Sequence, residues 1–190
     1  MRRLVLAAAV LPILASACRG PDVTILRGPE LPSDIYGDPG PTPTADLPDT
    51  GDVWLVKEGR LREVEDRPLQ GVATSQAEAL MLALLQGPAG VRGLTTEIPR
   101  ATRLNSLEVD EGVATVDLSE NFELGPSRDV KMRLAQVVYT LTEDRRVRAV
   151  EFAFDGVPEE SIPVPGLGLP VDRPVNRSDY ESLTRPPPKG

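Results

Sequence analysis

Proline is distributed very unevenly along this chain of 190 residues, and its distribution limits where regular structure can form. Of the 20 prolines, seven lie in residues 19–51 and eight in residues 157–190. Only four lie in residues 52–156. Proline removes a backbone donor and interrupts helices and central strands. We therefore expect one packed domain over residues 52–157, between two proline-rich segments.

The N-terminus has the features of an export signal. Two arginines follow Met1, and residues 4–14 form an apolar run that is too short to span a bilayer. Small residues then precede Cys18, the only cysteine, in a pattern that resembles a bacterial lipobox. The alternative is ordinary cleavage after a small residue. Because the single cysteine occupies the one position that requires it, we predict a lipoprotein signal peptide over residues 1–17 and lipid attachment, with acyl chains such as palmitate, at Cys18.

Residues 18–51 separate this cysteine from the expected domain. Residues 19–51 contain seven prolines, five glycines and six acidic residues against two arginines. This composition is typical of a solvated, partly stiff tether. A few apolar residues leave open the alternative that the segment packs on the domain. We interpret it as a tether between the membrane and the domain.

Hydrophobic periodicity between the proline-rich segments predicts both strands and helices. Strand patterns occur at residues 53–56 and 61–64, in a hairpin at residues 104–118, and at residues 147–154. Helical patterns occur at residues 75–86 and 127–143, and Ser75 with Glu78 has the spacing of a capping box. The β-β-α-β-β-α-β order predicts an α+β fold, with a mixed or antiparallel sheet of about five strands and two helices packed on one face.

The second helical pattern contains polar residues that recur every three or four positions. This spacing predicts one polar stripe on a helix whose remaining surface is broad and apolar, so we expect the helix to be deeply packed. The stripe consists of Asp129, Arg133, Gln136, Thr140 and Glu143.

The residue types present exclude most enzymatic chemistry. The chain has no histidine, which excludes imidazole-based catalytic triads and histidine-ligated metals. One cysteine cannot form an intramolecular disulfide or a cysteine cluster. The acidic residues lack both an EF-hand register and the clustered aromatic residues that would accompany a glycosidase site. We therefore predict a protein that is not an enzyme, without catalytic residues, cofactors or metal ligands.

The net charge of the chain limits the classes of binding partner that we expect. The formal net charge is -8 and the isoelectric point is about 4.7, which argues against binding to nucleic acid. Arg145, Arg146 and Arg148 form the one basic cluster. They are a candidate interaction surface for a cell-wall polymer or an acidic partner. The alternative is that they complement the C-terminus of the preceding helix and flank a solvated strand edge.

The proline-rich C-terminal segment, residues 158–190, contains too many apolar residues for a solvated tail. We expect it to be partly docked: it would run extended over the domain as far as Thr184, with Tyr180 and Leu183 packed onto it. Ser178 and Glu181 have the spacing of a capping box, so a short helical turn is predicted to start at Ser178.

Several stretches of the middle segment together resemble the GerMN domain, a family first associated with bacterial sporulation and spore germination. They lie at residues 79–80, 84–88, 98–104, 107–119, 136–142 and 147–150, together with Phe122 and a closing Asp155-Gly156. The resemblance covers residues 52–157 in a single copy, whereas some relatives carry two. It implies an interaction module without known catalysis at the outer face of the cytoplasmic membrane.

Together these features predict a lipid-anchored protein on the extracytoplasmic face of the cell membrane. Its function would be to bind an envelope protein in a sporulation, germination or sensor-accessory role. The alternative is a module that binds cell-wall glycan. A groove with convergent polar groups would favour ligand binding, and a flat apolar edge would favour a protein partner.

Overall fold

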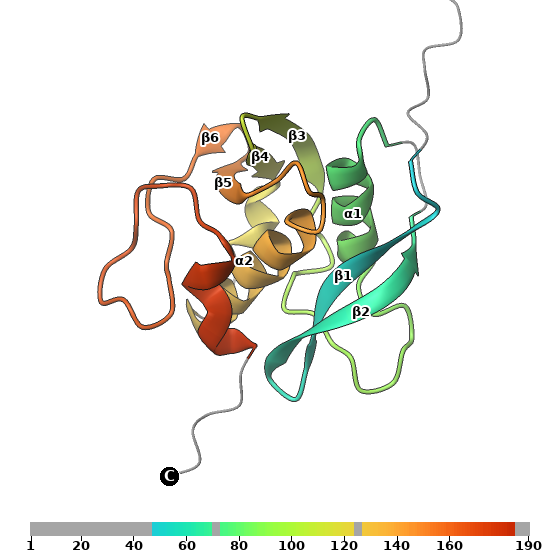
Figure 1. Ribbon diagram of the computed structural model, residues 1–190. Coiled ribbons are helices and arrows are strands. Elements are labelled where there is room, and N and C mark those ends of the chain that lie inside the picture. Colours follow the sequence, from blue (N-terminus) through green and yellow to red (C-terminus); the bar gives the residue numbers. More distant parts are fainter. Residues whose placement is uncertain (1–46, 70–72, 124–126, 185–190) are drawn as a thin grey trace, which may run out of the picture. The chain divides into compact units, whose positions relative to one another are not determined.

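The computed structural model describes residues 47–69, 73–123 and 127–184 (Figure 1). The chain divides into two units, residues 1–42 and 43–190, and the described residues all belong to the second. The predicted signal peptide, Cys18 and most of the predicted tether therefore lie outside the described residues. Within the described ranges, the helices are too short or too polar to cross a bilayer.

The strands form two separate sheets. In the first sheet, β1 (Thr50–Lys57) pairs antiparallel with β2 (Arg60–Pro68). The second has the order β3-β4-β5-β6, and β4 and β5 run parallel while the other neighbours are antiparallel. Its strands are β3 (Leu104–Asp110), β4 (Val113–Leu118), β5 (Ala149–Phe154) and β6 (Val157–Pro158). The predicted α+β class is confirmed, with the strands divided between two sheets instead of joined in one.

Within the described residues, two α-helices and two short 3-10 helices accompany the sheets. The α-helices are α1 (Gln76–Leu85) and α2 (Ser127–Leu141), and the short helices are η2 (Glu120–Phe122) and η3 (Arg177–Leu183). The start of α1 lies where the sequence predicts it, because the Ser75 hydroxyl accepts the Glu78 N–H at 3.2 Å. The predicted capping box is only half formed: the Glu78 carboxylate accepts hydrogen bonds from the backbone and hydroxyl of Thr74 instead of from Ser75.

Helix α2 lies at the centre of the core. It contacts α1, the first sheet, β5 and η3, and Figure 1 shows it between the two sheets. Side chains from every layer are fully buried around it, including Leu55, Met81, Val116 and Val138. At one end of this core, the rings of Phe122 and of two phenylalanines of β5 stack with centroids 5.6–6.5 Å apart. The mostly aliphatic core therefore joins both sheets into one packed unit.

The middle of the predicted polar stripe is buried, in contrast to the usual arrangement in which such a stripe faces solvent, whereas Glu143, just after α2, is partly exposed and the side chain of Asp129 lies outside the described residues. Arg133 is 3% exposed, and Gln136 and Thr140 are fully buried. The Thr140 hydroxyl accepts the Trp54 N–H at 2.9 Å, and the Gln136 amide donates to the Trp54 carbonyl at 3.1 Å. The stripe therefore supplies partners for the edge of β1 that faces away from β2.

The same edge of β1 is completed by the segment that leads into β3. Val56 and Thr95 exchange two backbone hydrogen bonds of 2.8 Å. The side-chain oxygen of Gln136 accepts the Glu97 N–H at 2.9 Å, so this one side chain joins α2 both to β1 and to the segment that leads into β3. Buried backbone groups need partners, and here a helix and a loop provide them in place of a third strand.

The C-terminal segment packs against the second sheet. Val150 of β5 and Val175 exchange backbone hydrogen bonds of 2.8 and 2.9 Å. Tyr180, which we expected to dock, is fully buried, and Leu183 packs partly buried against the core. The short helix begins at Arg177, one residue before the predicted start. Its capping residue is Asn176, whose side chain accepts the Ser178 N–H at 2.9 Å while Asp179 accepts the Asn176 N–H at 2.9 Å.

Candidate functional site

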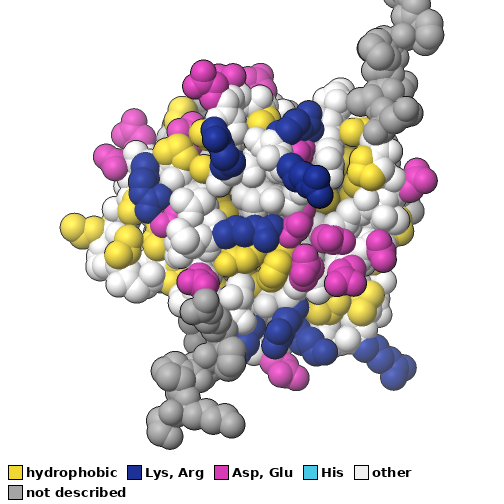
Figure 2. Space-filling view, viewed as in Figure 1, with side chains coloured by type: hydrophobic (Ala, Val, Ile, Leu, Met, Phe, Trp, Pro, Cys, Tyr) yellow, Lys and Arg dark blue, Asp and Glu magenta, His cyan; other side chains and the backbone are white. Residues whose placement is uncertain are grey.

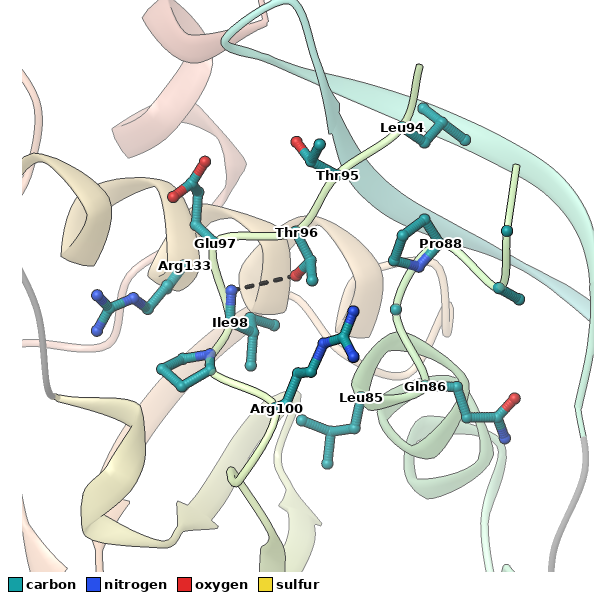
Figure 3. Close-up of a pocket in the computed structure, with 14 residues that line it drawn as sticks. Leu85, Gln86, Pro88, Leu94, Thr95, Thr96, Glu97, Ile98, Arg100 and Arg133 are labelled. Atoms are coloured by element: carbon teal, nitrogen blue, oxygen red, sulfur yellow. Dashed lines mark hydrogen bonds between the residues drawn. The ribbon is translucent and has the colours of Figure 1, made fainter. Parts of the chain in front are cut away.

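An open groove lies between the C-terminal end of α1 and the start of β3 (Figure 3), and we call it the α1–β3 groove. Its volume is about 920 Å³. Nearly all of its lining comes from the connection between these two elements, and one side chain, Arg133, comes from α2. The lining residues are Leu85–Gly90, Leu94–Arg100 and Arg133.

Local sequence explains the shape of this groove. Gly87 adopts a left-handed conformation (φ +69°), and Pro88 follows it, so α1 ends and the chain turns away. The Arg67 guanidinium holds this turn by donating to the Gly87 carbonyl at 2.9 Å. On the opposite wall, the hydroxyl of Thr96 accepts the Ile98 N–H at 3.1 Å, a bond drawn in Figure 3. Two independently anchored turns therefore face each other across the opening.

Polar and charged groups converge on the groove. Arg100 is exposed and extends towards its centre in Figure 3, whereas Arg133 is almost fully buried in its wall. Glu97 is the one acidic residue among the lining side chains. The lining contains no aromatic residue, so it lacks the flat platform on which sugars usually stack. The arrangement suits an extended, hydrogen-bonding segment better than a sugar ring.

A second polar cluster joins β1, α2 and η3, and we call it the Arg177 cluster. The Arg177 guanidinium donates to the Thr142 hydroxyl at 2.6 Å and to the Tyr139 carbonyl at 2.9 Å, and it forms an ion pair with Glu143. It also lies 5.6 Å from the ring of Trp54 and 5.1 Å from the ring of Tyr139. The Trp54 indole N–H donates to Glu143 at 2.8 Å. One arginine therefore holds the C-terminal segment through several contacts at once.

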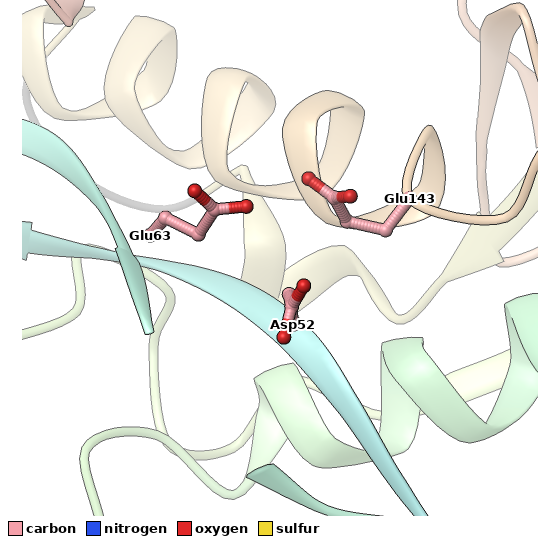
Figure 4. A group of neighbouring side chains, drawn as sticks. All are labelled: Asp52, Glu63 and Glu143. Atoms are coloured by element: carbon pink, nitrogen blue, oxygen red, sulfur yellow. The ribbon is translucent and has the colours of Figure 1, made fainter. Parts of the chain in front are cut away.

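Three carboxylates meet beside this cluster (Figure 4). Asp52, Glu63 and Glu143 each have an oxygen within 4.8 Å of the others, and Figure 2 shows acidic side chains gathered over the β1–β2 hairpin. Partial burial raises the pKa of Glu63, and the charge of Glu143 raises it further. Asp52 already accepts the Asp66 N–H at 3.1 Å, and Glu143 is paired with Arg177. These contacts hold Asp52 and Glu143 in place, whereas the like charges around Glu63 outweigh the opposite charge of Arg177, and its pKa stays raised.

Replacing Glu63 with glutamine should stabilise the domain at neutral pH. A carboxylic acid whose pKa is raised in the folded state favours the fold in its neutral form, so stability falls as the pH rises through that pKa. Glutamine is neutral at every pH, so the variant should not lose stability in this way as the pH rises. The melting temperature of Glu63→Gln should exceed that of the natural protein at pH 7, and the difference should vanish in acid. Glu108→Gln on β3, in the other sheet, is the control, and equal effects of the two variants would contradict the assignment.

The three arginines of the candidate basic surface follow α2 closely in sequence but differ in their surroundings. Arg146 is paired at 2.7 Å with Asp144, whose side chain is 2% exposed. Burial raises the pKa of Asp144, but its hydrogen bonds with Arg146 outweigh this effect and the pKa is lowered. Arg148 donates to the Glu111 carbonyl, and Arg145 is exposed. All three arginines are exposed, and Arg146 and Arg148 also hold turns of the domain through these contacts.

Comparison with models of protein families shows which family the chain belongs to. The Germane family, described as "Sporulation and spore germination", matches residues 47–160. The chain belongs to this family. The matched range contains both sheets, α1 and α2, and it therefore includes the whole α1–β3 groove.

Solved structures agree with the family on the fold. The tandem GerMN domains of the sporulation protein GerM from Bacillus subtilis are 21% identical, with a TM-score of 0.54 over 68% of this chain. This chain spans 46% of that tandem structure. The first GerMN domain of the same protein is 20% identical, with a TM-score of 0.53, and the match covers 68% of this chain and 98% of that domain. No curated protein matches. The resemblance to a GerMN domain is thus confirmed.

The main features of both sites could not be found from the sequence. Of the three carboxylates beside the Arg177 cluster, Glu143 lies eighty or more residues after Asp52 and Glu63, and no periodicity relates them. The C-terminal segment was expected to dock, but its sequence does not show which groups Arg177 would contact. The α1–β3 groove does have a sequence signal, because its walls are the Gly87-Pro88 and Ile98-Pro99-Arg100 turns that carry the GerMN resemblance.

Proposed function

We propose that this protein is a non-catalytic lipoprotein of the cell envelope, whose GerMN domain binds another envelope protein through the α1–β3 groove. The observation that carries the proposal is the groove itself: an opening of about 920 Å³ built from turns within the range that defines the family. Membership of a sporulation and spore germination family supports a role in envelope assembly. The export-type N-terminus and the single cysteine support the membrane anchor.

By the criterion drawn from the sequence, a groove with convergent polar groups favours ligand binding over contact with a flat apolar edge, and the lining favours a protein segment as that ligand. Its walls present backbone turns, threonine hydroxyls and Arg100, which suit the amide groups and side chains of an extended peptide. The alternative, binding of cell-wall glycan, is supported by the polar character of the opening. It is weakened by the lack of an aromatic residue among the described lining residues. We therefore keep glycan binding as the second candidate.

The groove is tested by site-specific photo-crosslinking in intact cells. A photo-reactive residue replacing Arg100 should capture a discrete envelope protein. The same residue replacing Arg92, which is exposed in the same connection but outside the lining, should not. Arg100→Ala should weaken co-purification of the captured protein without lowering the melting temperature. Capture of peptidoglycan fragments instead of protein would support the second candidate, and equal capture at both positions would refute the groove.

The anchor is tested separately. Labelling with a fatty-acid analogue should mark the natural protein, and Cys18→Ser should remove the label because no other cysteine is present. The variant should also leave the membrane fraction, since two or three acyl chains are needed for stable attachment. Equal labelling of both proteins would refute the anchor and leave the groove experiment unaffected.

A further inference from the structure

The C-terminal segment carries an apolar loop that stands away from the rest of the domain, and we call residues 163–170 the leucine loop. Its base is closed by Ile162 and Val171, which exchange two backbone hydrogen bonds of 2.9 Å. Figure 1 shows this orange-to-red loop projecting beside β6 and η3, and Figure 2 shows hydrophobic side chains standing out there. Leu167 is 51% exposed and Leu169 is 81% exposed.

The residues at the base of the leucine loop hold it in this position. Ile162 and Val164 are each 4% exposed and pack into the core, so the base of the loop is anchored. Prolines at positions 163, 165 and 170 restrict the backbone between these anchors. The two leucines are therefore presented outwards by a fixed frame, and exposed apolar groups of this kind mark contact surfaces.

The leucine loop also lacks charge. Residues 161–171 contain no charged residue, although charged residues make up 26% of the chain. Charges resume on both sides with Glu159, Glu160 and Asp172. A protein interface usually surrounds its apolar centre with polar contacts. The tip of the leucine loop is apolar, convex and uncharged. It is therefore better suited to contact with a fluid apolar medium, because such a medium does not need a pocket of matching shape.

We propose that Leu167 and Leu169 insert into the surface of the bilayer to which the chain is anchored. This inference rests on the lipid attachment proposed at Cys18. Attachment raises the effective concentration of the loop near the bilayer into the millimolar range, so weak insertion is sufficient. Because acidic residues flank the loop, insertion should not require anionic lipids, and they should weaken it.

The length of chain between the anchor and the domain permits this contact. Figure 1 places the start of β1 on the opposite side of the domain from the leucine loop. A domain of the size of residues 47–184 is about 37 Å across. The 29 peptide units from Cys18 to Leu47 reach about 100 Å when fully extended, which exceeds the path of about 58 Å around half of a domain of this diameter. The predicted tether is thus long enough to pass around the domain.

The test uses the full-length acylated protein reconstituted in phosphatidylcholine vesicles. Gly168→Cys provides one free thiol between the two leucines, since acylation blocks Cys18. A side chain at position 168 meets no atom within 4 Å. An environment-sensitive fluorophore on this thiol should shift to the blue in vesicles and be quenched by brominated acyl chains. The same fluorophore at Arg92→Cys should show neither effect.

Leucine removal provides the matched comparison. In the Gly168→Cys background, Leu167→Ser with Leu169→Ser should abolish the shift, each change lowering insertion by about tenfold or more. Val91→Ser removes another exposed apolar side chain, 48% exposed, and should leave the shift intact. Melting temperatures of all variants should agree with that of the parent. Vesicles with equal parts of phosphatidylglycerol should give an equal or smaller shift.

Distinct outcomes would overturn the proposal. Flotation with the vesicles without a blue shift would refute the loop contact and leave the anchor standing. Absence of flotation would refute the anchor and, with it, this proposal. A shift that appears without vesicles and grows with protein concentration would identify a second copy of the chain as the partner. A shift that requires added envelope proteins would identify a protein partner.

Discussion

Replacing Tyr180 with alanine should lower the free energy of unfolding by about 3–5 kcal/mol, the usual cost of removing a buried aromatic ring. Tyr180 is fully buried and is among the largest fully buried side chains described. Its ring packs in the core that both sheets share, and its hydroxyl donates to the Pro163 carbonyl at 3.3 Å. The substitution would leave a cavity where η3 docks, so the C-terminal segment should detach before the rest unfolds.

Thermal melting and limited trypsin digestion measure this effect. The melting temperature should fall by about 10–20 °C, from the usual dependence on free energy in domains of this size. Trypsin should cut Tyr180→Ala rapidly after Arg177 and spare the natural protein, whereas Arg173 precedes Pro174 and is not a trypsin site. Tyr180→Phe is the control, because it loses one long hydrogen bond and should cost about 1 kcal/mol or less. Rapid cleavage of the natural protein after Arg177 would show that the segment is not docked.

The second large effect is expected for Gln136→Leu. Leucine fills nearly the same space but leaves the Trp54 carbonyl and the Glu97 N–H without their partner. Each unsatisfied buried group costs about 1–3 kcal/mol, so the two together should cost about 2–6 kcal/mol. A buried helix position whose side chain makes no hydrogen bonds would tolerate leucine well. The loss of stability in Gln136→Leu therefore tests whether the buried polar residues of α2 support β1.

Thr140→Val provides a graded comparison for this prediction. It removes only the acceptor of the Trp54 N–H, so it should cost about half as much. Urea titrations of the three proteins give the free energies directly. If Gln136→Leu were as stable as the natural protein, the hydrogen bonds to the edge of β1 would contribute nothing and the stripe would need another explanation.

Local signals in the sequence were sufficient for most of the elements. Ser75 before an apolar helical pattern and Gly87-Pro88 after it bound α1 closely, because both ends depend on residues next to the helix. The turn at residues 110–112 likewise fixed the β3–β4 hairpin. These features need no knowledge of distant parts of the chain, and each was predicted within one or two residues.

Features that depend on distant contacts were not predictable in the same way. The division of the strands into two sheets follows from packing on α2, and no strand pattern carries that information. The regular spacing of the stripe on α2 was detected, but its burial follows from Trp54, more than eighty residues earlier. The capping pair of η3 was misplaced because Asn176 and Asp179 offer the same spacing as Ser178 and Glu181.

In the candidate sites, too, local features were predictable and features that depend on distant contacts were not. Arg145, Arg146 and Arg148 were found as a charge cluster, but sequence could not show that Arg146 is paired with buried Asp144. The turns around the α1–β3 groove were recognised by their glycine and proline residues, whereas the opening between them is a property of the folded chain. Cys18 stays a prediction, since it lies outside the described residues.

The closure of β1 by α2 has a consequence for the order in which the chain folds. Trp54 is separated by 82–89 residues from its partners on α2 and in the turn that follows it. Whether the chain emerges from the ribosome or from the membrane that it crosses, the β1–β2 hairpin appears before the helix that covers its edge. An uncovered strand edge is a template for pairing with other chains. The hairpin should therefore be the part of the nascent chain that most needs a chaperone, and folding should be completed late and in one step.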